Sequence, residues 1–290
     1  MLFSIYTRDI PSESAPASSL QFADDIALTC ARRTAQEVSD ALSLAVTSLS
    51  SWLDARGLVL NAKKSNVLVF TSSSGQQPDV GVRCRNDVLP HTTSAKYLGV
   101  LIDERMTWQP QVDRCISRTA RKIGSLWRAR RCLTLASRSK YFLSVIMPDL
   151  IYGSSAYGSG LTHNQLNRLQ VAQNRAARAV FGRPRFTRAS DLLERLSVYR
   201  MDEVYRQKLL VLVWRCVHNR ASPALQALFV RNCGATRLQR SLGLQQPIAR
   251  SRAGQCRPAS RGCLLWNHIP DTVRAMGNIP AFRQAAIPYT

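Results

Sequence analysis

The feature that most constrains the fold is a pair of adjacent aspartates, Asp24 and Asp25, set between two short apolar runs. The surrounding sequence, Leu20-Gln-Phe-Ala-Asp-Asp-Ile-Ala-Leu28, predicts a strand, a tight turn that carries the acids, and a second strand. Carboxylate oxygens are the preferred ligands of hard cations such as Mg²⁺, and a rigid hairpin holds them in place. The other interpretation is an ordinary acidic turn, because Asp is a common turn residue.

Further patterns follow the paired aspartates in a fixed order. Two of them are Gly57-Leu-Val-Leu-Asn61-Ala-Lys-Lys64-Ser65 and Lys96-Tyr97-Leu98-Gly99-Val100. Later segments are Tyr152-Gly153, Gln173-Asn-Arg-Ala-Ala-Arg178 and Leu265-Trp266-Asn267. Together with Phe22-Ala-Asp-Asp25, this ordered set resembles the motifs of reverse transcriptases from non-LTR, LINE-type retrotransposons of the Jockey-like groups, with Ser65 in place of the usual Thr.

The resemblance implies an α+β fold in three parts. Residues 1–106 would form the C-terminal part of the polymerase palm, residues 107–220 a helical thumb, and residues 221–290 a basic tail with a small packed anchor. It also implies an RNA-directed DNA polymerase, a nucleotidyltransferase whose partners are an RNA template and a DNA primer. Its cofactor would be Mg²⁺, and the resemblance suggests no other small molecule besides nucleotides.

The resemblance assigns roles to individual residues. Asp24 would be the principal Mg²⁺ ligand and Asp25 the secondary one, and Lys64 would approach the pyrophosphate leaving group. The hairpin at Tyr97, Leu98 and Gly99 would position the primer end, with Gly99 allowing a close backbone approach. The alternatives are that Lys64 is an ordinary surface lysine beside Lys63 and that the hairpin is only structural.

The family palm also carries a third metal-binding Asp on an earlier strand and a Gly-rich segment against the nucleotide. Only 23 residues precede Asp24. We therefore expect the chain to be the C-terminal part of a polymerase that is inactive by itself, since two metal ions need more carboxylates. Two alternatives stay open, a basic nucleic-acid-binding module without catalysis and a non-functional transposon remnant.

The charge of the chain, +22, implies a polyanionic partner such as nucleic acid. Between Arg114 and Arg131, helical spacing places an apolar face opposite a basic one, and no acid occurs from Arg114 to Lys140. The predicted apolar face holds Ile116, Ala120, Ile123 and Trp127, and the basic face holds Arg114, Arg118, Arg121 and Arg128. A solvated face is the simpler alternative, but a face of one sign favours phosphate contact.

A second helix is predicted near 165–181, ending at Gly182. Its apolar side holds Leu166, Leu169, Ala172, Ala176 and Val180, and its basic residues Arg168, Arg175 and Arg178 lie beside that side. These three arginines complete the predicted nucleic-acid interface.

Other segments predict further elements. Thr34 and Glu37 form a capping-box pattern for a helix that Gly57 would end. Residues 66–70 and 98–102 read as strands, and residues 204–217, which contain Trp214, read as a core helix. The segment from Arg231 to Arg261 carries arginines without acidic counterparts, so we expect partial disorder and folding on nucleic acid.

The eight cysteines contain no Cys-x-x-Cys pair, and their spacing matches no common zinc finger. We expect them to be small buried thiols in a reducing compartment. No apolar run of membrane-spanning length and no signal peptide is visible, which predicts no membrane association and an intracellular location in nucleus and cytoplasm.

Overall fold

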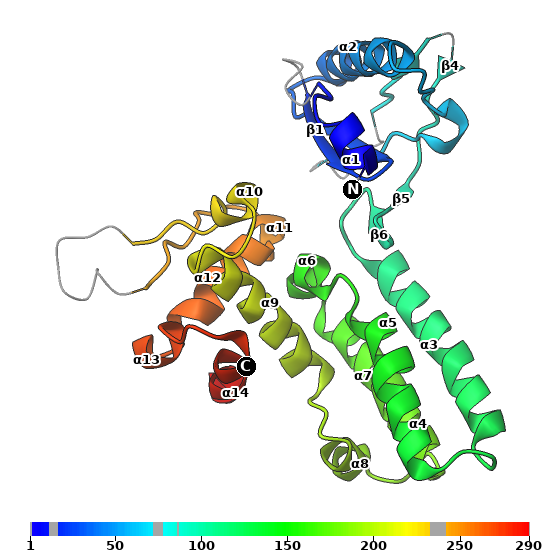
Figure 1. The fold of residues 1–290 in the computed structure, drawn as a ribbon, viewed down its shortest axis with the longest axis vertical. Helices are drawn as coiled ribbons and strands as arrows, with labels where there is room; N and C mark the ends of the chain where they lie inside the picture. Colours follow the sequence, from blue (N-terminus) through cyan, green and yellow to red (C-terminus); the bar gives the residue numbers. More distant parts are fainter. Residues whose placement is uncertain (1, 12–16, 72–77, 86, 233–241, 290) are drawn as a thin grey trace. The chain divides into compact units, whose positions relative to one another are not determined.

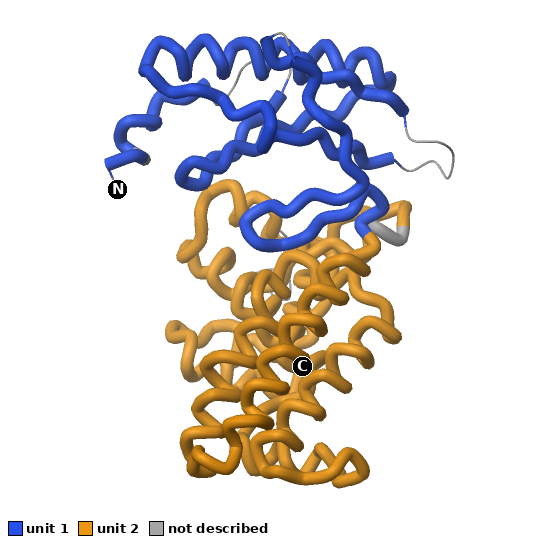
Figure 2. The backbone as a smooth tube through the Cα atoms, turned by 90° about the vertical axis from the view of Figure 1, so that its right-hand side faces the viewer, with its two compact units in different colours: residues 1–106 blue, residues 107–290 orange. Residues whose placement is uncertain are grey.

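The computed structural model describes residues 2–11, 17–71, 78–85, 87–232 and 242–289. The described chain mixes many helices with a few short strands, as the predicted α+β class requires (Figure 1). It divides into two compact units, Met1–Met106 and Thr107–Thr290 (Figure 2). Each unit has its own core.

The strands of the first unit form three antiparallel pairs. They are β1 (Ser18–Phe22) with β2 (Asp25–Thr29), β3 (Arg83–Cys84) with β4 (Asp87–Val88), and β5 (Ser94–Tyr97) with β6 (Val100–Asp103). Each strand is five residues or shorter. Two-stranded ladders of this size are marginal alone in water, so they depend on packing against a helix.

The helix α2 (Ala35–Asp54) packs against β2 and β3, while the shorter α1 (Leu2–Tyr6) lies near the start of the chain. The predicted capping box is present, because Thr34 accepts from the Glu37 N–H while the Glu37 carboxylate accepts from the Thr34 N–H. Gly57 follows the helix with a φ of +67°, a left-handed conformation that suits glycine. The buried face of α2 joins two small apolar clusters, whose members include Val46, Leu49, Leu53, Val67, Val80 and Val82.

The strand predicted over residues 66–70 is wrong. Only Val67 makes a ladder contact, an isolated parallel bridge to His91. The Val67 N–H donates to the Pro90 carbonyl at 2.9 Å, and the Val67 carbonyl accepts from Thr92. The β-branched composition of the segment favours extended backbone, but strand stability comes from cross-strand partners, and the neighbouring described residues provide one. Before this segment, residues Ala62–Lys64 form the short 3₁₀ turn η1.

The second unit is mainly helical. Its elements are α3 (Gln109–Ala129), α4 (Leu135–Tyr141), the π-helical turn η2 (Phe142–Ile146), α5 (Met147–Ile151), α6 (Ser154–Tyr157), η3 (Gly158–Gly160), α7 (His163–Phe181), α8 (Ala189–Arg195), α9 (Met201–Val217), α10 (Pro223–Gln226), α11 (Arg252–Gln255), α12 (Pro258–Asn267), α13 (Asp271–Arg274), α14 (Ile279–Ala286) and η4 (Ile287–Tyr289).

The core of this unit surrounds α9, which confirms that residues 204–217 form a core helix. Trp214 of α9, Trp266 of α12 and Phe282 of α14 are fully buried and belong to one cluster. Both indole N–H groups have acceptors, since Trp214 donates to the Met276 carbonyl at 2.9 Å and Trp266 to the Leu242 carbonyl at 2.6 Å. The predicted packing around Trp266 is therefore present.

The segment from Arg231 to Arg261 lies partly outside the described residues, which leave out 233–241 and with them Arg237 and Arg240. The described parts are held by specific contacts. Arg231 forms a bridge with Leu244, and Leu244 exchanges two hydrogen bonds with the Asn267 side chain at 2.9 and 2.8 Å. These contacts attach both flanks of the segment to the core of α9 and α12.

The two longest helices of the second unit, α3 and α7, run side by side in the same direction. Their N-terminal ends are joined by the Gln165 amide, which donates to the Thr107 carbonyl at 2.8 Å, and by the ion pair of Arg168 with Asp113 at 2.6 Å. Because the helices have similar lengths, their C-terminal ends also lie at the same end of the unit (Figure 1).

Candidate functional site

The paired aspartates lie at the tip of the β1–β2 hairpin, which confirms the predicted strand, turn and strand. Phe22 pairs with Asp25, so the turn consists of Ala23 and Asp24, with Ala23 at a φ of +53°. The Gln21 amide braces this turn by donating to the Ala23 carbonyl at 3.1 Å and to the Thr7 hydroxyl at 2.7 Å. Sequence reasoning missed Gln21, because nothing in the sequence connects it to residue 7.

Both carboxylates are exposed to solvent. Within the described residues, neither has an ion pair or a side-chain hydrogen bond, so their oxygens remain available to a cation. No cluster of three or more His, Cys, Asp or Glu side chains suited to a metal ion occurs in the part of the chain that the structure describes. Two carboxylates could hold one Mg²⁺ that keeps several water ligands, but they are too few to bridge two cations.

Lys64 ends the η1 turn that follows α2. The Asn61 side chain caps this turn by accepting from the Lys64 N–H at 3.2 Å, and the Lys64 side chain is exposed. Asn61 and Lys64 therefore form one local unit, in which the amide fixes the backbone from which the lysine extends.

Tyr97, Leu98 and Gly99 form the end of the β5–β6 hairpin. Leu98 and Gly99 are its two turn residues, with φ of +45° and +84°, and Tyr97 pairs with Val100. A two-residue hairpin turn with both residues at positive φ favours Gly or Asn. The geometry of the turn therefore explains why a glycine occupies position 99. The strand expected over 98–102 begins only at Val100, because Leu98 and Gly99 make the turn.

The buried face of α3 differs from the predicted one. Val112, Cys115, Thr119 and Leu126 are buried. The predicted apolar residues Ile116 and Ile123 are half-buried, Ala120 is exposed, and Trp127 is 43% exposed. At 100° per residue the true face lies about a quarter turn from the predicted one. Counting apolar residue types missed it because the buried face includes the polar Thr119 and Cys115, and Cys115 Sγ lies 3.9 Å from the Tyr157 hydroxyl of α6.

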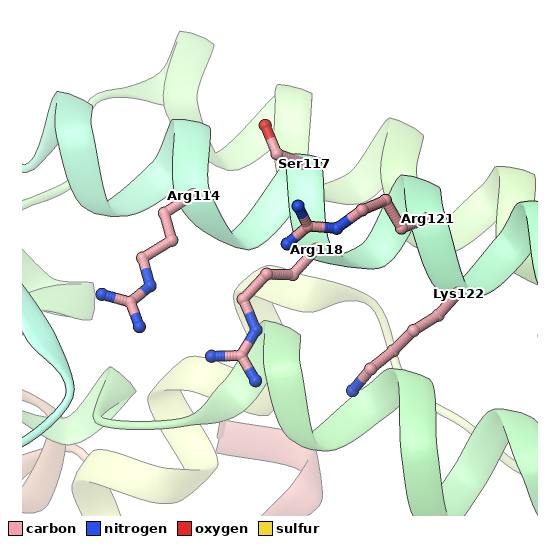
Figure 3. A pocket seen from close by; sticks show the side chains of 5 residues that line it. All are labelled: Arg114, Ser117, Arg118, Arg121 and Lys122. Atoms are coloured by element: carbon pink, nitrogen blue, oxygen red, sulfur yellow. The ribbon is translucent and has the colours of Figure 1, made fainter.

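The basic face of α3 forms a shallow groove lined by Arg114, Ser117, Arg118, Arg121 and Lys122 (Figure 3). This groove is not purely basic, contrary to the prediction. Asp149 of α5 pairs with Arg118 at 3.1 Å and with Lys122 at 2.6 Å. Lys122 also donates to the Val145 carbonyl at 2.8 Å. Sequence inspection missed Asp149 because it lies on another helix.

The predicted basic residues of α7 have different environments. Arg168 pairs with Asp113, and Arg178 donates to the Thr187 carbonyl at 2.9 Å. Partial burial opposes ionisation of Asp113, but hydrogen bonds from Gln109 and Arg168 and the charge of Arg168 outweigh it, so the pKa of Asp113 is lowered. Arg175 is exposed and forms no ion pair within the described residues.

The structure therefore divides the seven predicted phosphate-binding arginines into two groups. Arg118, Arg168 and Arg178 have protein partners. Among the described residues, no acid pairs with the remaining four, which are Arg114, Arg121, Arg128 and Arg175. Arg128 has one weak contact, to the Ser125 hydroxyl at 3.4 Å.

The cysteines of the described chain are free thiols, and Cys84, Cys115, Cys216 and Cys263 are buried, while Cys233 lies outside the described residues. Burial is the main reason why the pKa values of the Cys115, Cys216 and Cys263 thiols are raised.

In the described part of the chain, no helix combines the length and the hydropathy that crossing a membrane requires.

Comparison with known proteins finds relatives among polymerases of mobile elements. A probable RNA-directed DNA polymerase from transposon BS of Drosophila melanogaster is 29% identical over 213 residues, which are 70% of this chain and 23% of the relative. The RNA-directed DNA polymerase from mobile element jockey of Drosophila funebris is 28% identical over 217 residues, covering 71% and 23%. A probable RNA-directed DNA polymerase from transposon X-element of Drosophila melanogaster is 27% identical over 199 residues, covering 66% and 22%.

The matched region thus spans less than a quarter of the length of these curated relatives. No family model matches the chain, and no solved structure matches it either. The relatives agree with the resemblance that the ordered motifs indicated. The sequence of the chain is therefore similar to those of RNA-directed DNA polymerases from jockey-like non-LTR retrotransposons.

Proposed function

We propose that this chain is part of an RNA-directed DNA polymerase in which Asp24 and Asp25 bind Mg²⁺. The observation that carries the proposal is the hairpin tip, where two adjacent residues carry exposed carboxylates without protein partners among the described residues. Bound there, Mg²⁺ would polarise the primer 3′-hydroxyl and the nucleotide phosphates. An ordinary surface turn needs neither adjacent acids nor the bracing contacts of Gln21.

The same proposal assigns roles to the other residues and to the three parts of the chain. Asp24 is the principal metal ligand and Asp25 the secondary one. Lys64 neutralises charge that develops on the leaving pyrophosphate. The hairpin of Tyr97, Leu98 and Gly99 holds the primer end. In this proposal residues 1–106 act as palm, residues 107–220 as thumb and residues 221–290 as a basic tail.

The 290-residue chain alone should not extend a primer. Two carboxylates are too few to bridge two cations about 4 Å apart, and the described residues contain no larger acidic cluster suited to a metal. The test is primer extension on an RNA template with Mg²⁺ and nucleotides. Incorporation that disappears in Asp24→Ala would contradict the proposed inactivity and would leave the metal-binding role intact.

We also propose that α3 and α7 bind a primer–template duplex through its phosphates. This role belongs equally to a non-catalytic binding module, which would not depend on Asp24. Arg114, Arg121, Arg128 and Arg175 support the proposal, because they are cations without acidic partners in the described structure. Arg118 and Arg168 contribute less, since a phosphate would have to compete with Asp149 or Asp113.

The salt dependence of binding tests this second role. Each neutralised phosphate contributes about −0.9 to the slope of log affinity against log salt on duplex DNA. If roughly four arginines make contact, affinity should fall by about two decades between about 50 and 200 mM salt. Arg121→Ala should reduce the slope by about one unit, whereas Arg118→Ala should reduce it less. Equal effects of the two changes would show that the Asp149 ion pair does not matter for binding.

A further inference from the structure

The segment between α7 and α8 displays an aromatic ring among cations. Its sequence is Gly182-Arg-Pro-Arg-Phe-Thr-Arg188. Phe186 is 85% exposed, one of the most exposed large apolar side chains in the described structure. Arg183, Arg185 and Arg188 are exposed around it, and no ion pair engages them within the described residues. None of these four residues belongs to the interface on α3 and α7.

This segment is held in a defined shape. Gly182 ends α7 at a φ of +63°, and the Arg183 N–H returns to the Arg178 carbonyl at 2.9 Å. Arg178 then reaches across the segment to the Thr187 carbonyl, and the Thr187 N–H donates to the Pro184 carbonyl at 3.1 Å. The ring of Phe186 is therefore displayed from a fixed backbone.

The surroundings extend the positive charge of the segment. Because α3 and α7 run in the same direction, the C-terminal end of α3 lies at the same end of the unit as the segment 182–188 (Figure 1). The last turn of α3 adds the exposed cation Arg128, and the turn after the helix adds Arg131. The last turn of α3 also carries Trp127, which is 43% exposed and has the Arg130 guanidinium 3.8 Å from its ring centre.

A simpler explanation is that arginines stabilise helix C-termini through the helix dipole. Arg178 already serves this purpose at the end of α7, and Arg195 contacts the Phe181 ring at 5.1 Å. The simpler explanation leaves Arg183, Arg185 and Arg188 without a function. It also gives no reason for keeping Phe186 in water.

We propose that the segment 182–188 binds single-stranded nucleic acid, with an unpaired base stacked on Phe186 and the flanking phosphates bound by Arg183, Arg185 and Arg188. Aromatic rings beside cations recognise single strands in this way, because every base offers a π face while duplex bases are already stacked. The inference goes beyond the proposed polymerase role and does not depend on Asp24 or Asp25. It gives the second unit a single-strand site in addition to its duplex interface.

The test uses the full 290-residue chain and fluorescence anisotropy with labelled oligouridine, oligothymidine and a duplex of equal length. Phe186→Ala should weaken single-strand binding about tenfold and leave duplex binding unchanged. Phe186→Trp should retain single-strand binding, because it keeps an aromatic ring. The matched control is Phe70→Ala, which removes an exposed phenylalanine from the first unit. The RNA and DNA arms show which strand is the ligand.

A second measurement maps the contact directly. Thiouridine-containing RNA is photocrosslinked to the chain, which is then digested with trypsin. The crosslinked nucleotide should be found on the peptide Phe186-Thr-Arg188. Equal losses for duplex and single strand in Phe186→Ala would overturn the stacking proposal. The proposal would be overturned in favour of a membrane contact by a different pair of results. In that case Phe186→Ala would weaken binding to anionic lipid vesicles and leave the affinity for every oligonucleotide unchanged.

Discussion

The two units differ in how deeply they bury their largest apolar side chains. In the first unit Leu20 and Phe22, on the hairpin that carries the aspartates, are 57% and 64% exposed. In the second unit Trp214, Trp266 and Phe282 are fully buried. Burial of apolar area is the main stabilising contribution to a fold. The comparison indicates that the helical unit is the stable part, while the candidate metal site lies on a hairpin with little core beneath it.

The largest expected effect is on the helical core. Trp266→Ala should lower the free energy of unfolding by about 3–5 kcal/mol, because it removes a fully buried indole and leaves the Leu242 carbonyl unpaired. Urea unfolding followed by tryptophan fluorescence and circular dichroism measures the change.

The matched control for this change is Trp127→Ala, which truncates a half-exposed tryptophan on α3. We expect a cost below about 1 kcal/mol, since surface positions contribute little. A large loss in Trp127→Ala would mean that the apolar face read from the sequence is the buried one after all.

The second effect concerns close packing between α9 and α12. A Cβ atom at Gly262 would lie 2.8 Å from Val213 Cγ2 and 3.0 Å from Phe229 Cε1. Gly262→Ala should therefore destabilise the second unit by about 1–3 kcal/mol through overpacking. Thermal unfolding compares it with Gly124→Ala on α3, where the nearest atom is Arg128 Nη1 at 3.6 Å. That control should be neutral or stabilising, as Ala favours helix. The same sign for both changes would refute the close contact.

How much of this was predictable depends on the range of the interactions. The hairpin at Asp24, the capping box at Thr34 and the end of α7 at Gly182 depend on neighbours within a few residues, so the sequence predicts them. The ion pairs of Asp149 and the buried face of α3 depend on which helix lies opposite. No spacing rule within one helix contains that information.

A smaller effect is expected at the start of α2 in the first unit. Thr34→Ala removes the hydroxyl that accepts from the Glu37 N–H at 3.2 Å and should cost about 1 kcal/mol. Loss of far-ultraviolet ellipticity on heating provides the measurement. Ser222→Ala is the control, because the Ser222 side chain makes no capping bond to α10. Should both substitutions cost the same, the capping box would not stabilise this unit.

The smallest effect is a pH dependence of the second unit. Burial raises the pKa of the Cys263 thiol to about 11, while a thiol in an unfolded chain has a pKa of about 8.5. The unfolded chain therefore loses this proton first, so stability is complete below about pH 8.5 and falls as pH rises toward the folded pKa. Denaturant unfolding at a series of alkaline pH values should show a shallower decline in Cys263→Ala. An unchanged decline would assign the alkaline loss to other groups, such as Tyr157 or Tyr205, whose pKa values burial also raises.

The most direct test of the central claim is cleavage by Fe²⁺ placed at the proposed Mg²⁺ site. With peroxide, Fe²⁺ held by Asp24 and Asp25 generates hydroxyl radicals that cut nearby nucleic acid, which requires no catalytic turnover. In a labelled primer annealed to an RNA template, we predict cuts clustered near the primer 3′ end. Asp24→Asn and Asp25→Asn should abolish the cuts without loss of binding, and Asp40→Asn, which changes an exposed acid on α2, should retain them. Identical cutting in Asp24→Asn, or bound primer without clustered cuts, would contradict a metal site at this hairpin.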